Sequence, residues 1–126
     1  MSKEECYIMI IDDNVYTLKS VSNALEMNGY PARSYCNPLN AILDYNPERF
    51  PLVITDYQMP DASGLDILKY IRKIKHDAHI IIYTGLNDDS VSREIQKYGA
   101  DEFYKPLDIE KLIQRIEEIM NKKEKK

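Results

Sequence analysis

The sequence lacks tryptophan and any long apolar run, and it has only two cysteines and two histidines. No run approaches the length of a membrane span, and residues 1–5 do not have the layout of a signal peptide. The net charge is −4, and the ten tyrosines are scattered rather than interleaved with basic residues. The negative net charge excludes an overall electrostatic field that attracts nucleic acid or an anionic membrane. The scattered tyrosines exclude an aromatic platform on which nucleic-acid bases stack. We therefore expect a cytoplasmic protein that binds neither membranes nor nucleic acid directly.

The two cysteines, Cys6 and Cys36, have no metal-ligand spacing. A disulfide between them is one interpretation, but the fold expected below places them at opposite ends of their strands, too far apart to bridge. We therefore expect free thiols in a reducing compartment. His76 and His79 have no partner at ligand spacing, which favours structural or exposed positions for both.

The 126 residues, of which 44% are hydrophobic, suffice for one domain with a core of its own. No linker and no low-complexity segment divides the chain. We expect a single domain over residues 1–126, with its core between about residues 7 and 120 and a basic, frayed tail over residues 121–126.

Short apolar runs alternate with helical patterns along the chain. The predicted strands are Tyr7–Ile11, Arg33–Tyr35, Leu52–Thr55, Ile80–Tyr83 and Phe103–Tyr104. Three of them are continuous and rich in Ile and Val, which is typical of parallel strands covered by helices on both faces. Five strand–helix units with right-handed crossovers predict a doubly wound α/β fold. We expect a flavodoxin-like three-layer sandwich with five parallel strands in the order 2-1-3-4-5.

Helical spacing and stop signals place five helices between and after these strands. The first is expected at about residues 15–27, and the second follows Pro38 and ends near Asn46-Pro47. The third begins at Ser63 or Gly64, the fourth ends at Gly99, and Asp108 caps the fifth. Apolar side chains on one stripe indicate the buried faces. These are Val15, Leu18, Ser22 and Leu25, then Leu65, Leu68 and Ile71, then Val91, Ile95 and Tyr98, and finally Ile109, Leu112, Ile113, Ile116 and Met120.

Polar residues follow the predicted strands at their carboxyl ends, where sheets of this kind bind ligands. They are Asp12-Asp13, Asp56, Thr84-Gly85 and Lys105-Pro106. Three carboxylates that lie close together repel one another unless a cation is present, and an oxygen-lined pocket with few protein ligands suits Mg²⁺. One carboxylate can then act as a nucleophile toward phosphorus and form an acyl phosphate. A lysine and a threonine hydroxyl can each bind a phosphoryl oxygen, and the glycine leaves room for close approach.

These residues carry a family resemblance that extends from about Tyr7 to Met120. The matching pieces are Ile11-Asp12-Asp13, Asp56-Tyr57-Gln58-Met59-Pro60, Ser63-Gly64, Tyr83-Thr84-Gly85, Gly99-Ala100-Asp101 and Lys105-Pro106. Together and in this order, they resemble the receiver domain of two-component response regulators. The resemblance implies a signalling switch that catalyses only its own phosphotransfer and dephosphorylation.

The resemblance also implies a role for each matching residue. Asp56 is expected to accept a phosphoryl group from a histidine of a sensor kinase or phosphotransfer protein. Mg²⁺ is expected to be held by three carboxylates and one backbone carbonyl, those of Asp12, Asp13, Asp56 and Gln58. Thr84 and Lys105 are expected to contact the phosphoryl group, and the Lys105-Pro106 bond is expected to be cis.

One departure from the family pattern concerns the switch. The segment between Gly99 and Lys105 is one residue shorter than usual, so Glu102 stands where receivers often carry a mobile aromatic ring. Strand alternation places Tyr104 on the face of Glu102 and Phe103 on the other, which favours Tyr104 as the mobile ring. The expected output surface is the fourth helix, fifth strand and fifth helix, read by a downstream protein or output domain. The protein is expected to be a monomer or a weak dimer that depends on phosphorylation.

The acidic residues admit three other interpretations. Asp12 or Asp13 alone is a good helix cap, but both beside Asp56 favour a site. A haloacid-dehalogenase-type phosphohydrolase needs two aspartates separated by one residue, which Asp12-Asp13-Asn14-Val15 does not supply. A pseudo-receiver without phosphotransfer has no use for mutually repelling carboxylates. No output domain follows Met120, so the chain is either a stand-alone regulator or a part of a longer protein.

Overall fold

The computed structural model describes the backbone of residues 6–124 and the side chains of residues 6–121. Five parallel strands form one sheet in the order β2-β1-β3-β4-β5, which confirms the predicted fold class and strand order. The strands are β1 Ile8–Ile11, β2 Ala32–Tyr35, β3 Leu52–Asp56, β4 His79–Thr84 and β5 Asp101–Tyr104. The helices are α1 Val15–Met27, α2 Pro38–Asp44, α3 Gly64–Ile74, α4 Asp89–Lys97 and α5 Ile109–Glu124.

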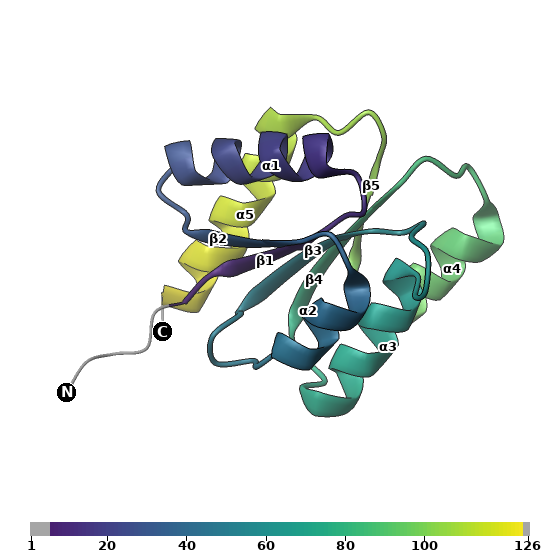
Figure 1. Cartoon of the computed structure of the whole chain (residues 1–126). Coiled ribbons are helices and arrows are strands. Elements are labelled where there is room, and N and C mark those ends of the chain that lie inside the picture. Colours follow the sequence, from purple (N-terminus) through teal and green to yellow (C-terminus); the bar gives the residue numbers. More distant parts are fainter. Residues whose placement is uncertain (1–5, 125–126) are drawn as a thin grey trace.

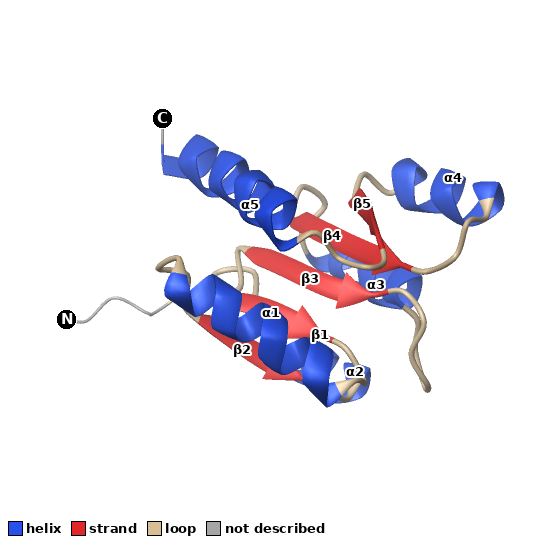
Figure 2. Ribbon diagram, turned by 90° about the horizontal axis from the view of Figure 1, so that it is seen from above, coloured by secondary structure: helices blue, strands red, loops and turns tan. Residues whose placement is uncertain are grey.

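Helices cover the sheet on both sides, with α1 and α5 on one face and α2, α3 and α4 on the other (Figure 1; Figure 2). Successive side chains of a strand point to opposite faces, so the apolar runs of β1, β3 and β4 supply both cores. In β1, for example, Ile8 and Ile10 belong to the core beneath α1 and α5, whereas Met9 and Ile11 belong to the other core. This two-sided burial explains why these runs are continuous rather than alternating.

The helix starts are set by side-chain caps. The Asn14 carboxamide accepts hydrogen bonds from the backbone N–H groups of Tyr16 and Thr17, and therefore caps α1. The cap of α1 is thus the residue after the two aspartates, which leaves Asp12 and Asp13 available for other contacts. Asp108 caps α5 as predicted, because its carboxylate accepts from the N–H of Lys111 at 3.2 Å.

The predicted buried face of α1 needs correction, and those of α3 and α5 each gain one residue. In α1, Val15 is 56% exposed and Ser22 is half-buried, whereas Val21 joins Leu18 and Leu25 in the core. The stripe at positions 18, 21 and 25 lies over the sheet, and the start of the helix projects beyond it. In α3, Ile67 is buried beside Leu68 and Ile71, while Leu65 is half-buried. In α5, Ile119 is buried while Ile109 and Met120 are half-buried.

The predicted frayed tail is also partly wrong, because α5 continues to Glu124. Lys125 and Lys126 lie outside the described residues. Cys6 and Cys36 are free and exposed, as predicted. None of the helices in residues 6–124 is long and apolar enough to cross a membrane.

Arg72 of α3 joins two loops on the α4 side of the sheet, the α3–β4 loop and the α4–β5 loop. Its guanidinium donates to the carbonyl oxygens of Tyr98 at 2.6 Å, Ala78 at 2.7 Å and Gly99 at 3.2 Å. Gly99 follows α4 with a φ of 77°, a left-handed conformation that glycine adopts without steric cost. The arginine therefore satisfies carbonyls at the end of α4 that would otherwise lack an intrahelical partner.

Candidate functional site

The predicted acidic residues converge at the carboxyl ends of β1 and β3. Asp12 and Asp13 follow β1, and Asp56 is the last residue of β3, the strand paired beside it. One carboxylate oxygen from each lies within 4.8 Å of the other two. Asp12 and Asp56 are 1% and 3% exposed, whereas Asp13 is open to solvent. The sheet topology thus places two buried carboxylates and one exposed carboxylate around one point.

Lys105 completes this cluster from the end of β5. Its Nζ lies 3.1 Å from Asp56 Oδ1, but this buried oxygen has no aligned hydrogen-bond partner among the described residues. Burial raises the pKa of Asp56; the Lys105 ammonium lowers it, the charge of Asp12 raises it, and the backbone N–H of Gln58 lowers it. The net direction is upward, so ionised Asp56 is costly without a further cation.

Asp12 is anchored through both of its carboxylate oxygens. Its Oδ1 accepts from the backbone N–H of Asn14 at 2.9 Å, and its Oδ2 accepts from the Tyr83 hydroxyl at 2.6 Å. Burial first, and the hydrogen bond to Asp12 second, raise the pKa of Tyr83 above its ordinary value. The phenol therefore remains a proton donor toward Asp12 at neutral pH.

Tyr83 is a site residue that the sequence reasoning missed. It was assigned to a hydrophobic strand, and its ring does lie in the core beneath α1 and α5. The one available signal in the sequence was that Tyr83, with its polar hydroxyl, ends the otherwise aliphatic run Ile80–Tyr83.

Thr84 is buried at the end of β4, and its hydroxyl oxygen accepts from the N–H of Leu86 at 2.9 Å. Its carbonyl accepts from the N–H of Lys105 at 2.9 Å, which fixes the lysine beside Asp56. The Lys105-Pro106 bond is cis, as predicted. A Cβ at Gly85 would meet only the Lys105 Cδ at 3.8 Å, an ordinary contact within the protein, and the room that this glycine leaves for a phosphoryl group stays a prediction.

Gly64 is the glycine that the site does require. A Cβ at this position would lie 2.6 Å from the carbonyl oxygen of Asp56 and 3.0 Å from the Cα of Tyr57. The first turn of α3 can therefore pack against the end of β3 only without a side chain. Ser63 starts the helix in a capping box with Asp66, with hydrogen bonds of 3.1 and 3.0 Å.

The residues of the expected switch lie on two faces of β5. Phe103 packs against the core beneath α5, whereas Glu102 and Tyr104 face α4. Ser92 of α4 donates to Glu102 at 2.8 Å, and its hydroxyl lies 3.4 Å from that of Tyr104. The predicted sharing of one face by Glu102 and Tyr104 is confirmed, while the mobility of the Tyr104 ring stays a prediction.

The donor set fits Mg²⁺. The cluster offers hard carboxylate oxygens at the spacing of a single ion, and one of them, Asp56 Oδ1, is buried without a hydrogen-bond partner among residues 6–121. Gln58 is exposed on the loop after β3, at the same end of the sheet as the three carboxylates. An oxygen-only set that keeps one carboxylate open to water is unsuited to a closed zinc centre.

Comparison with known proteins agrees with this geometry. Residues 8–117 match the family described as "Response regulator receiver domain". The chain belongs to this family, whose members are signalling domains that accept a phosphoryl group on an aspartate.

Several individual proteins are similar over most of this chain. The transcriptional regulatory protein FixJ of Rhizobium meliloti is 32% identical over 112 residues, which are 87% of this chain and 54% of that protein. Sporulation initiation phosphotransferase F of Bacillus subtilis is 29% identical over 106 residues, 83% of this chain and 86% of that protein. A solved receiver domain from Clostridium thermocellum has a TM-score of 0.85 at 31% identity, covering 94% of this chain and 97% of that one. The chain spans 30% to 54% of the length of three curated transcriptional regulators that it matches.

Proposed function

We propose that Asp56 is the phosphoryl acceptor of this receiver domain and that the transfer depends on Mg²⁺. The observation that carries the proposal is the convergence of three carboxylates within 4.8 Å, with the Lys105 ammonium 3.1 Å from the buried Asp56 oxygen. Asp56 is the one member of the cluster that contacts the lysine. Its Oδ1 accepts no aligned hydrogen bond among the described residues, so this carboxylate keeps lone pairs for attack on phosphorus.

The transfer forms one bond and breaks one bond. A carboxylate oxygen of Asp56 attacks phosphorus, the bond from phosphorus to the donor breaks, and the donor leaves with its electron pair. The product is an aspartyl acyl phosphate, and hydrolysis by water returns the carboxylate and inorganic phosphate. The chain catalyses only these reactions on itself, which makes it a switch rather than an enzyme with a separate substrate.

Each neighbouring residue has a role in this step. Asp12, Asp13, Asp56 and the backbone carbonyl of Gln58 would hold Mg²⁺, and the bound ion neutralises negative charge on the phosphoryl group. Lys105 pairs with a phosphoryl oxygen in place of the Asp56 carboxylate. The Thr84 hydroxyl, now bonded to the N–H of Leu86, turns to the phosphoryl group.

The donor is a phosphohistidine of a sensor kinase or of a phosphotransfer protein. The name of the Bacillus subtilis relative, a phosphotransferase of nearly the same length as the matched segment, supports a relay role for a domain of this size. The output is a downstream protein or an output domain, as in the longer transcriptional regulators. Two free cysteines agree with a reducing cytoplasm as the place of this exchange.

The phosphorylated site acts on the surface formed by α4, β5 and α5. The phosphoryl group carries a charge of about −1.5 to −2 at the carboxyl end of β3, where it replaces the single negative charge of the Asp56 carboxylate. Contacts to Thr84 and Lys105 transmit the change to β5, where the Ser92, Glu102 and Tyr104 cluster joins the strand to α4. A partner that prefers one arrangement converts the change into output, as a monomer or a weak phosphorylation-dependent dimer. We propose that the chain of 126 residues is a single receiver domain, with its core between about residues 7 and 120.

The test is the intact mass of the protein after incubation with acetyl phosphate, with and without Mg²⁺. We expect one phosphoryl adduct that requires Mg²⁺ and is absent from Asp56→Asn. Asp61→Asn is the matched control, because Asp61 is an exposed aspartate of the neighbouring loop with a φ of 74°, which asparagine tolerates. Absence of any adduct in the wild type, or an adduct retained in Asp56→Asn, would refute the assignment.

A further inference from the structure

Tyr83 joins the sheet core to the acidic site. Its side chain is completely buried on the α1 and α5 side of the sheet, among aliphatic residues of β1, β3 and β4. Only its hydroxyl leaves this apolar environment, and it donates to Asp12 Oδ2 at 2.6 Å. Tyr83 lies in β4 and Asp12 directly follows β1, and these two strands are separated in the sheet by β3. The phenol therefore spans a neighbouring strand to reach the carboxylate.

The hydrogen bond from Tyr83 is the second of two that fix the orientation of the Asp12 carboxylate. With the Asn14 N–H on Oδ1 and the Tyr83 hydroxyl on Oδ2, the plane of the carboxylate is fixed from two sides. Each oxygen keeps a further lone pair, because a carboxylate has about four acceptor sites. The free lone pairs are thus aimed before any ligand arrives, in a group that is 1% exposed.

The same ring also lies beside the lysine of the site. The Lys105 ammonium is 5.7 Å from the centroid of the Tyr83 ring and 3.1 Å from Asp56 Oδ1. The negative face of the ring favours this position for a cation. One side chain therefore contacts both the anchored carboxylate and the cation that pairs with Asp56.

We propose that Tyr83 is a positioning residue of the acidic site, whose hydroxyl holds Asp12 in the orientation that receives a divalent cation. This inference rests on the proposed Mg²⁺ site. Hydrogen bonds from outer residues orient metal ligands, and their loss commonly weakens metal binding by roughly 10- to 100-fold. Phenylalanine at this position keeps the packed ring and removes only the oxygen. The cation affinity then falls because the Asn14 N–H alone no longer fixes the plane of the Asp12 carboxylate.

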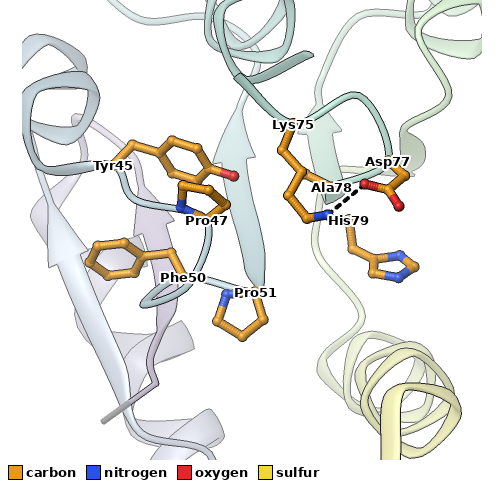
Figure 3. A pocket seen from close by; sticks show the side chains of 8 residues that line it. All are labelled: Tyr45, Pro47, Phe50, Pro51, Lys75, Asp77, Ala78 and His79. Atoms are coloured by element: carbon orange, nitrogen blue, oxygen red, sulfur yellow. Dashed lines mark hydrogen bonds and ion pairs between the residues drawn. The ribbon is translucent and has the colours of Figure 1, made fainter. Parts of the chain in front are cut away.

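The matched control is Tyr45→Phe, which also removes one phenol oxygen. Tyr45 lies beside a hollow of about 190 Å³ near Pro51 and His79, at the amino ends of β3 and β4 (Figure 3). This is the end of the sheet opposite to the acidic site. Its hydroxyl is buried and has no hydrogen-bond partner among the described residues, so its removal breaks no contact near the carboxylates.

The experiment measures divalent-cation binding directly, without phosphorylation. Free Mn²⁺ is counted by electron paramagnetic resonance, and Mg²⁺ binding is followed by calorimetry, for the wild type, Tyr83→Phe and Tyr45→Phe. We expect the dissociation constants of Tyr83→Phe to rise about 10-fold or more, and those of Tyr45→Phe to remain at the wild-type value. Equal affinity in Tyr83→Phe and the wild type would overturn the inference while leaving the proposed metal site intact. A wild type that binds neither ion would refute the metal site itself.

A second readout keeps the test independent of the stability of the variant. In wild-type protein labelled with ¹³C at the tyrosine Cζ, the Tyr83 resonance should move on addition of Mg²⁺, whereas that of Tyr45 should not. A Tyr83 resonance that stays in place would mean that its hydroxyl does not contact the carboxylate that receives the cation. Such a result would contradict the positioning role even if Tyr83→Phe folded poorly.

Discussion

Asparagine in place of Asp56 should stabilise the metal-free protein at neutral pH, although most substitutions of buried residues destabilise. Burial raises the pKa of Asp56, and the charge of Asp12 adds to this effect. Folding at pH 7 must therefore keep an ion in a position that favours its neutral form. Asparagine has nearly the same shape without the charge, and its amide can donate to the carboxylates of Asp12 and Asp13. Lys105 loses an ion-pair partner but is 42% exposed, so water replaces much of that interaction.

The expected gain is about 1 kcal/mol, the usual scale for relieving one unfavourable group at a functional site. Unfolding entropy is about 2.1 cal/mol/K per residue, or about 0.26 kcal/mol/K for this chain of 126 residues. The melting temperature of Asp56→Asn should therefore exceed that of the wild type by about 4 °C.

The sign of the pH dependence follows from the raised pKa of Asp56. A carboxyl group of this kind contributes its full stability below its unfolded pKa and loses that contribution as pH rises through the raised folded pKa. The difference in stability between Asp56→Asn and the wild type should thus be largest at neutral pH and should shrink as the solution is acidified. Saturating Mg²⁺ stabilises the folded state because the ion binds only the folded site. It should raise the melting temperature of the wild type more than that of Asp56→Asn, because the variant lacks one carboxylate ligand.

The assay is thermal unfolding by circular dichroism, in chelator and in Mg²⁺, at neutral and acidic pH. Asp77→Asn is the control for net charge, because Asp77 is an exposed residue at the opposite end of the sheet that pairs with Lys75 at 2.7 Å. It should bring no gain in stability. A lower melting temperature for Asp56→Asn in chelator, or an equal gain in Asp77→Asn, would refute the reasoning.

Four further substitutions test the scaffold of the fold by urea unfolding. Gly64→Ala should cost about 1–3 kcal/mol, because its Cβ would lie 2.6 Å from a carbonyl oxygen of β3; Gly85→Ala should be nearly neutral, and equal costs would contradict this difference. Ser63→Ala should cost about 1 kcal/mol through loss of the α3 cap, and no loss would mean that the capping box is not stabilising. Arg72→Met should cost about 3 kcal/mol, since it leaves three carbonyl groups without their donor; a neutral effect would show that water replaces those bonds.

The fold was predictable because the residues that determine it are adjacent in the sequence. Continuous runs such as Ile80–Tyr83 identify buried parallel strands without knowledge of their neighbours. The edge strand β2 gave the weakest pattern, since half of its side chains face solvent and it carries Arg33 and Ser34. Helix faces were less certain, as Val15 and Val21 show, because burial depends on where a helix crosses the sheet.

The acidic site was predictable from topology, since the ends of neighbouring parallel strands must meet. Asp12, Asp56 and Lys105 lie together for this reason. The contact between Tyr83 and Asp12 was not predictable, because it crosses an intervening strand and depends on the length and direction of one side chain. The steric need for Gly64 rather than Gly85 likewise follows only from the position of α3 against β3.

The central claim is that Asp56 is the phosphorylated residue, and chemical trapping of the acyl phosphate tests it most directly. Borohydride reduces an aspartyl phosphate to homoserine, so protein treated with acetyl phosphate and Mg²⁺ is reduced, digested and sequenced by tandem mass spectrometry. The account predicts homoserine at position 56, only in samples that contained both acetyl phosphate and Mg²⁺. Homoserine at position 12 or 13, or none at any position, would contradict it.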